Sequence, residues 1–137
     1  MILFYTDMTH IKRGGARMKT ILIVEDNKLN MKLFNDLLQA HGYKIYQSSD
    51  GKDIVQLVRK YCPDLIIMDI QLPEICGLDC TRLLKAEDDL KDIPVVAVTA
   101  HALKGDETAI MEAGCDGYIA KPITVPNFLQ TVASFII

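Results

Sequence analysis

The chain has 137 residues, of which 50% are hydrophobic and 24% are charged, and its formal net charge at pH 7 is −3. This length and composition suit one globular domain with a hydrophobic core of its own. The negative charge and the lack of a Lys/Arg cluster argue against a nucleic-acid-binding surface. The longest hydrophobic runs are far shorter than the roughly 20 residues of a membrane span, which argues against membrane insertion.

The first 17 residues read as an N-terminal extension. Gly14, Gly15 and scattered charges interrupt any hydrophobic period in this segment. We expect residues 1–17 to be disordered or absent from the native protein, with translation starting at Met18 and the domain covering 18–137. The four cysteines form no Cys-x-x-Cys pair, so we expect reduced thiols in a cytoplasmic protein.

From residue 20 onward, short hydrophobic runs alternate with amphipathic segments. The expected strands are 20–25, 43–47, 64–69, 94–99 and 117–121. The first amphipathic segment is expected to be a helix, because its hydrophobic residues recur at helical spacing: Leu29, Leu33, Phe34, Leu37 and Leu38. Further helices are expected near 54–61, 77–86, 105–113 and after Thr124, and the turn at 48–51 is expected to supply the N-cap of the second.

The third and fourth expected strands are hydrophobic throughout, as strands covered on both faces are. Strands that alternate with helices in this way predict an α/β fold, a doubly wound parallel sheet of five strands. No internal repeat or second domain is evident.

Four of the five expected strands end in a chemical group: Glu25 with Asp26, Asp69, Thr99 and Lys121. In a parallel sheet these ends meet at one edge, which is where open α/β sheets bind ligands. Two carboxylates 5 Å apart repel by roughly 3 kcal/mol at an effective dielectric constant of 20. Three acids therefore need a cation, and oxygen ligands favour Mg²⁺ and phosphoryl chemistry. The alternative is that Asp26 or Asn27 only caps the first helix, which would explain one residue of the set.

Four segments carry a resemblance to a known family, namely residues 21–27, 65–73, 95–100 and 117–122. Over about residues 19–135 the chain resembles the receiver domain of two-component response regulators, the CheY-like family. Within that family it is most similar to single-domain regulators of the cell cycle. The resemblance implies a (βα)5 flavodoxin-like fold with strand order 2-1-3-4-5 and a cis bond between Lys121 and Pro122.

The resemblance also implies a role for each residue of the expected site. Asp69 would be the phosphoacceptor, because a carboxylate can attack phosphorus and form an aspartyl phosphate. Glu25, Asp26, Asp69 and the backbone carbonyl of Gln71 would hold Mg²⁺. Lys121 would pair with one phosphoryl oxygen, and the Thr99 hydroxyl would hydrogen-bond another.

Four positions are expected to switch or tune the site. Tyr118 matches an aromatic residue that turns inward after phosphorylation, and the fourth helix, fifth strand and fifth helix would form the output surface. Ala100 is small and leaves the phosphoryl site open, while Gln71 and His101 flank it and would tune dephosphorylation. The alternatives are that Tyr118 is an edge-strand aromatic packed on the fourth helix and that His101 is a solvated loop residue.

We expect no output domain, so the signal would leave through protein contacts. A histidine kinase or phosphotransfer protein would dock near the first helix and the loop after the fifth strand, and a downstream protein would read the output surface. The protein would be a monomer or weak dimer, and not a turnover enzyme, since autodephosphorylation would be slow.

Two alternatives to this function are open. The first is a Mg²⁺-dependent phosphatase of the haloacid-dehalogenase type, although Gln71 stands where such enzymes carry an acid. The second is a pseudo-receiver that binds partners without phosphorylation, against which Asp69, Thr99 and Lys121 argue.

Overall fold

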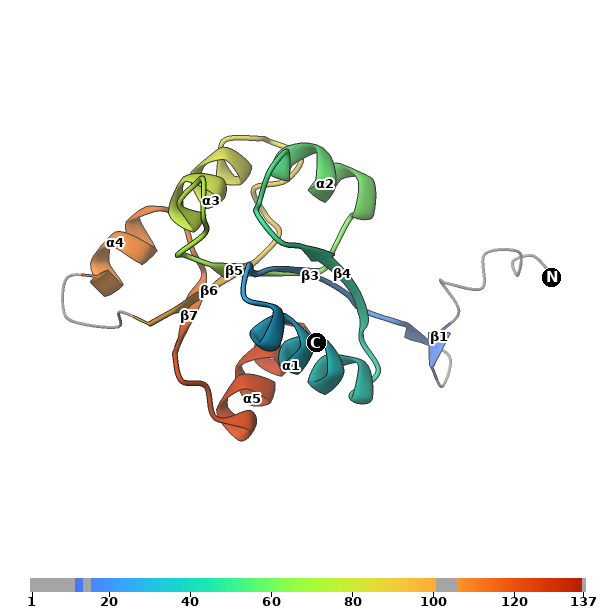
Figure 1. Cartoon of the computed structure of the whole chain (residues 1–137). Coiled ribbons are helices and arrows are strands. Elements are labelled where there is room, and N and C mark those ends of the chain that lie inside the picture. Colours follow the sequence, from blue (N-terminus) through green and yellow to red (C-terminus); the bar gives the residue numbers. More distant parts are fainter. Residues whose placement is uncertain (1–11, 14–15, 101–105, 137) are drawn as a thin grey trace.

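The computed structural model describes residues 12–13, 16–100 and 106–136 of the chain. Five strands form the main sheet: β3 (Thr20–Val24), β4 (Lys44–Ser48), β5 (Leu65–Asp69), β6 (Val95–Thr99) and β7 (Gly117–Ala120). The helices between and after them are α1 (Lys28–Ala40), α2 (Ile54–Tyr61), α3 (Gly77–Lys85), α4 (Asp106–Glu112) and α5 (Val125–Phe135). Strands and helices alternate along the chain, as predicted (Figure 1).

The strand order is β4-β3-β5-β6-β7, and every neighbouring pair is parallel. Counted within this sheet, the order is 2-1-3-4-5, which confirms the predicted α/β fold. The register brings the carboxyl ends of the strands to the same edge, with Val24 opposite Met68, Asp69 opposite Val98 and Thr99 opposite Ala120. Residues that follow these strands therefore meet at one place.

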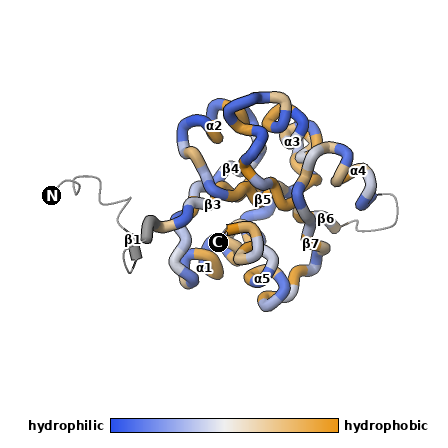
Figure 2. The backbone as a smooth tube through the Cα atoms, turned by 180° about the vertical axis from the view of Figure 1, so that it is seen from behind, coloured by the Kyte–Doolittle hydropathy of each residue, from blue (hydrophilic) through white to orange (hydrophobic). Residues whose placement is uncertain are grey.

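Helices cover both faces of the sheet, and alternate strand residues feed two separate cores. Ile21 and Ile23 of β3 point to the side of α1 and α5, where the Phe34 and Phe128 rings stack with centroids 4.9 Å apart. Leu22 and Val24 point to the side of α2, α3 and α4. In Figure 2 the central strands carry much of the hydrophobic colouring. This double cover explains why the middle strands are hydrophobic throughout.

The N-cap of helix α1 decides between Asp26 and Asn27 as the capping residue. The Asn27 side chain accepts a hydrogen bond from the backbone N–H of Asn30 at 2.9 Å, so Asn27 and not Asp26 caps the helix. The core face of α1 holds Met31, Phe34 and Leu38. Leu29 is 80% exposed and Leu33 is 40% exposed, so these two residues at helical spacing lie outside the core.

We expected the turn at 48–51 to supply the N-cap of α2, and this prediction was wrong. The N-cap is Asp53, whose backbone is left-handed at φ 55° and whose side chain makes no capping hydrogen bond. The side chains of the turn bond within the turn instead: Ser48 Oγ accepts from the Gly51 N–H at 3.1 Å, and Asp50 Oδ1 accepts from the Lys52 N–H at 2.9 Å. Asp and Ser side chains often satisfy turns in this way.

Two short strands precede the main sheet. β1 (Lys12–Arg13) and β2 (Ala16–Arg17) pair antiparallel and form a separate sheet away from the domain (Figure 1). The reading of residues 1–17 as an extension, and of Met18 as the start, stays a prediction. All four cysteines are free thiols. No helix among residues 16–100 and 106–136 is long and hydrophobic enough to cross a membrane.

Candidate functional site

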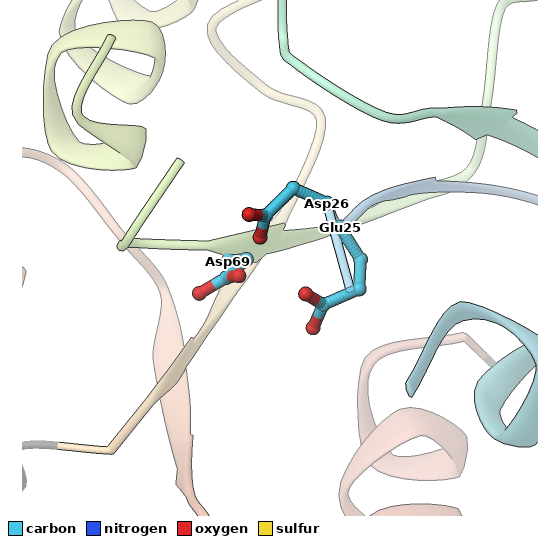
Figure 3. Close-up of side chains that lie close together, drawn as sticks. All are labelled: Glu25, Asp26 and Asp69. Carbon is cyan, nitrogen blue, oxygen red and sulfur yellow. The ribbon is translucent and has the colours of Figure 1, made fainter. Parts of the chain in front are cut away.

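Three carboxylates meet at the carboxyl edge of the sheet. Glu25 and Asp26 directly follow β3, and Asp69 is the last residue of the neighbouring strand β5. One carboxylate oxygen of each lies within 4.8 Å of the others, and Figure 3 shows the three groups gathered at this edge. Glu25 and Asp69 are each 2% exposed, whereas Asp26 is exposed. The parallel register thus produces the acidic cluster that the sequence predicted.

Lys121 brings a positive charge to the cluster. It follows β7, and its Nζ lies 3.2 Å from Glu25 Oε1 and 3.5 Å from Asp69 Oδ2. Its backbone N–H donates to the Thr99 carbonyl at 2.7 Å, which ties the end of β7 to the end of β6. The peptide bond between Lys121 and Pro122 is cis, as the family resemblance implied.

Thr99 reaches the same edge from β6. It is buried, and it directly follows Val98, which pairs with Asp69 across the β5–β6 register. The structure therefore brings to one edge all four groups that the sequence singled out: the acidic pair, the lone aspartate, the hydroxyl and the ammonium.

Backbone N–H groups fix the orientation of the two buried acids. The Asn27 N–H donates to Glu25 Oε2 at 3.1 Å, and the Gln71 N–H donates to Asp69 Oδ1 at 3.1 Å. The other oxygen of Glu25, Oε1, is buried and accepts no hydrogen bond from the residues that the structure describes. This oxygen lies 3.2 Å from the Lys121 ammonium, so it already faces a positive charge, and it would accept a bound metal ion as a second partner.

The pKa of Asp69 is raised to about 7, mainly by burial and then by the neighbouring Glu25 carboxyl, while the Gln71 N–H and Lys121 act in the opposite direction. The direction shows that the Lys121 ammonium does not outweigh burial and the neighbouring Glu25 carboxyl. A divalent cation would supply the missing positive charge.

The donor set of the cluster fits Mg²⁺. Carboxylate oxygens from Glu25, Asp26 and Asp69 are the hard ligands that this ion prefers, and exposed Asp26 leaves room for the several waters that Mg²⁺ retains. The metal-ligand role of the Gln71 carbonyl stays a prediction, since the described contact of Gln71 is its N–H to Asp69.

Two of the predicted tuning residues stand close in sequence to residues of this edge. Ala100 is exposed directly after Thr99, and Gln71 is exposed two residues after Asp69. Tyr118 is half-buried on β7 and packs against the core beside α4, where a hydrogen bond to Glu107 raises the pKa of its hydroxyl. This packing matches the alternative given for Tyr118, and its switching role stays a prediction. His101 lies outside the described residues.

One feature beside the site had no clear sequence signal. A groove of about 430 Å³ runs from α1 to the segment after β7 and is lined by Asn30, Leu33, Phe34, Ala100, Lys121, Pro122 and Ile123. Leu33 shares the helical spacing of the core residues of α1, so the sequence alone did not indicate that it lines a surface groove. The groove adjoins Lys121, so whatever fills it lies next to the acids.

Comparison with known proteins identifies the family. Residues 21–133 match the model of the response regulator receiver domain. The chain belongs to this family. DivK of Brucella anthropi, a polar-differentiation response regulator, is 53% identical over 118 residues that make up 86% of this chain and 96% of that protein. DivK of Brucella abortus is 52% identical with the same coverage.

Solved structures of receiver domains agree with this assignment. The receiver domain of a sensor histidine kinase from Pseudomonas aeruginosa superposes with a TM-score of 0.80 at 32% identity, covering 87% of this chain and 98% of that one. That structure has a magnesium ion coordinated in its active site cleft. The chemotaxis regulator CheY4 of Vibrio cholerae, at 22% identity and a TM-score of 0.81, covers 87% of this chain and 99% of its own and shares the fold.

Proposed function

We propose that this receiver domain accepts a phosphoryl group on Asp69 within a two-component phosphorelay and passes the signal on through protein contacts. One observation carries the proposal: the buried Asp69 carboxylate lies beside two further acids and 3.5 Å from the Lys121 ammonium. A nucleophile, a divalent-ion site and a fixed cation are the parts that phosphoryl transfer needs.

The residues divide the chemistry among them. A carboxylate oxygen of Asp69 attacks the phosphorus atom, the bond from phosphorus to the donor breaks, and the donor leaves with the bonding electrons. Mg²⁺, held by Glu25, Asp26 and Asp69, would neutralise charge on the phosphoryl oxygens. Lys121 pairs with one of these oxygens, and the Thr99 hydroxyl donates a hydrogen bond to another.

The surface beside the site suits a helical phosphodonor protein. Leu29 and Leu33 are exposed leucines on α1, four residues apart and therefore on one side of the helix. The groove next to Leu33 leads to Lys121. We infer that a histidine kinase or phosphotransfer protein docks here, because its phosphohistidine would then approach Asp69 from the open side of the cluster.

The output would leave from α4, β7 and α5, and half-buried Tyr118 on β7 would change its packing with the state of the site. The likeness to DivK supports a role in cell polarity or the cell cycle. The free cysteines agree with a reducing, cytoplasmic location. We propose a monomer or weak dimer whose partner is a downstream protein rather than nucleic acid.

Labelling by a small phosphodonor tests this function. With Mg²⁺ and acetyl phosphate, we expect the intact mass of the wild-type chain to rise by one phosphoryl group and that of the Asp69→Ala chain to stay unchanged. Absence of wild-type label would favour a pseudo-receiver. Steady turnover of p-nitrophenyl phosphate would contradict the proposed acceptor with slow autodephosphorylation and favour a phosphatase.

The docking surface gives a separate prediction. Leu33→Asp is expected to slow phosphoryl transfer from a phosphorylated phosphotransfer domain by about tenfold or more, because it places a charge in the hydrophobic contact. Labelling by acetyl phosphate should not change, since this donor needs no docking. The matched control is Leu83→Asp on α3, where Leu83 is 50% exposed on the other face of the sheet. Equal rates for both variants with the protein donor would remove α1 from the docking surface.

A further inference from the structure

Gly77, the first residue of α3, lies unusually close to the backbone of Asp69. A Cβ atom at this position would lie 2.2 Å from the Asp69 carbonyl oxygen and 2.8 Å from the Ile70 Cα. Ordinary contact of a Cβ begins at 3.4 Å, and both neighbours are backbone atoms that cannot rotate aside. Gly77 is buried, so helix α3 begins directly against the end of β5.

The need for glycine at this position comes from space and not from backbone conformation. Among the residues that the structure describes, the glycines with positive φ are Gly42, Gly51 and Gly114, and Gly77 is not one of them. An alanine could therefore adopt the backbone angles of residue 77 but could not fit its methyl group. The close approach of α3 to Asp69 exists only because residue 77 has no side chain.

Hydrogen bonds link Gly77 to the loop that orients Asp69. The Gly77 N–H donates to the Ile70 carbonyl at 2.8 Å, which closes the loop between β5 and α3. The next residue of that loop, Gln71, donates its N–H to Asp69 Oδ1 at 3.1 Å. On the helix side, the buried Thr81 hydroxyl donates to the Gly77 carbonyl at 3.0 Å. Movement of Gly77 therefore reaches the Asp69 side chain through Ile70 and Gln71.

We propose that Gly77 is a positioning residue for the phosphoryl site: its missing side chain lets α3 hold the backbone of Asp69, Ile70 and Gln71 in the geometry that binds Mg²⁺ and accepts the phosphoryl group. This inference rests on the proposed function of Asp69. A methyl group at residue 77 must displace either the end of β5 or the loop. A displacement of about 1 Å at a reacting group can cost on the order of 100-fold in rate.

The test compares two glycine variants of the full chain. Gly77→Ala is expected to raise the Kd for Mg²⁺, measured by calorimetric titration with MgCl2, by roughly tenfold. It should also slow labelling by acetyl phosphate by about 10–100-fold. The control is Gly114→Ala, at a residue that precedes the amino end of β7. This variant is also strained, because φ is 104° and the added Cβ would lie 2.8 Å from Lys85 Cγ. Gly114→Ala should lower the Tm but bind Mg²⁺ with the same Kd as the wild type.

Each outcome of this test decides the inference. If Gly77→Ala binds Mg²⁺ as the wild type does, or if Gly114→Ala weakens Mg²⁺ binding equally, the role of Gly77 is only structural. If Gly77→Ala does not fold, Thr81→Val removes the hydroxyl that holds the Gly77 carbonyl, and an unchanged Mg²⁺ Kd in that variant overturns the inference. A wild-type chain that binds no Mg²⁺ and takes no label refutes the proposed function itself.

Discussion

Asp69→Asn is expected to make the metal-free protein more stable than the wild type, by about 1–3 kcal/mol in the free energy of unfolding. The reason is that Asp69 is 2% exposed beside two other acids, so its charge is costly until a cation arrives. Asparagine removes this charge, and its side-chain oxygen can still accept the hydrogen bond from the Gln71 N–H. Urea unfolding in EDTA, with both chains at the same pH, measures the difference.

The same residue gives the stability a defined pH dependence. The pKa of Asp69 is about 7 in the folded chain, against an ordinary value of 3.8, so between pH 4 and 7 the folded state binds more protons than the unfolded state. Stability from this group is present below pH 4 and is lost as the pH rises to 7, by up to about 4 kcal/mol over the whole range. The advantage of Asp69→Asn over the wild type should therefore grow from pH 5 to pH 7.5. A difference that does not vary with pH would contradict the assigned environment of Asp69.

Mg²⁺ should remove most of the advantage of Asp69→Asn over the wild type. At a concentration 100 times its Kd, a ligand that binds only the folded state stabilises it by about 2.7 kcal/mol. We expect this gain in full for the wild type and in much smaller measure for Asp69→Asn, which has lost one of the three carboxylates. The control salt is NaCl at equal ionic strength, since exposed charges respond to screening alone.

Lys121→Ala is expected to lower the rate of labelling by acetyl phosphate about 100- to 1,000-fold at saturating Mg²⁺. Its Nζ lies 3.5 Å from Asp69 Oδ2, close enough to meet a phosphoryl oxygen bound to that carboxylate. Loss of one preorganised group that stabilises transition-state charge typically costs this much. The initial rate is read from intact mass at successive times.

A matched lysine separates this effect from a change in net charge. Lys32 on α1 pairs with Asp36 at 2.8 Å on the exposed side of the helix, so Lys32→Ala removes the same charge away from the acids. This control should label at the wild-type rate. A Lys121→Ala chain that labels within about twofold of the Lys32→Ala chain would show that the ammonium only compensates the resting charge of the acids.

The sequence allowed the site to be predicted because the site depends on strand ends. Glu25, Asp69 and Thr99 each end or follow a hydrophobic run, and a parallel sheet brings such ends together whatever the details of packing. The order of the strands needed the family resemblance, since alternation alone fits several orders. The cis bond before Pro122 needed it too, because the sequence around a proline rarely determines this isomer.

Features that depend on contacts distant in sequence could not be predicted. Helical spacing showed that α1 is amphipathic, but only packing against β3 decides that Phe34 is buried while Leu29 is 80% exposed. Asp53 is a residue type that N-caps prefer, but its left-handed backbone and its lack of a capping hydrogen bond depart from the usual N-cap geometry. The requirement for glycine at residue 77 comes from the Asp69 carbonyl, which no local pattern reveals.

A crystal structure of the full chain with MgCl2 and beryllofluoride, an analogue of the acyl phosphate, tests the central claim most directly. We expect beryllofluoride on a carboxylate oxygen of Asp69 and one Mg²⁺ held by Glu25, Asp26 and Asp69, with Lys121 Nζ turned to a fluorine atom. Beryllofluoride bound elsewhere, or Mg²⁺ bound away from these three carboxylates, would contradict the account.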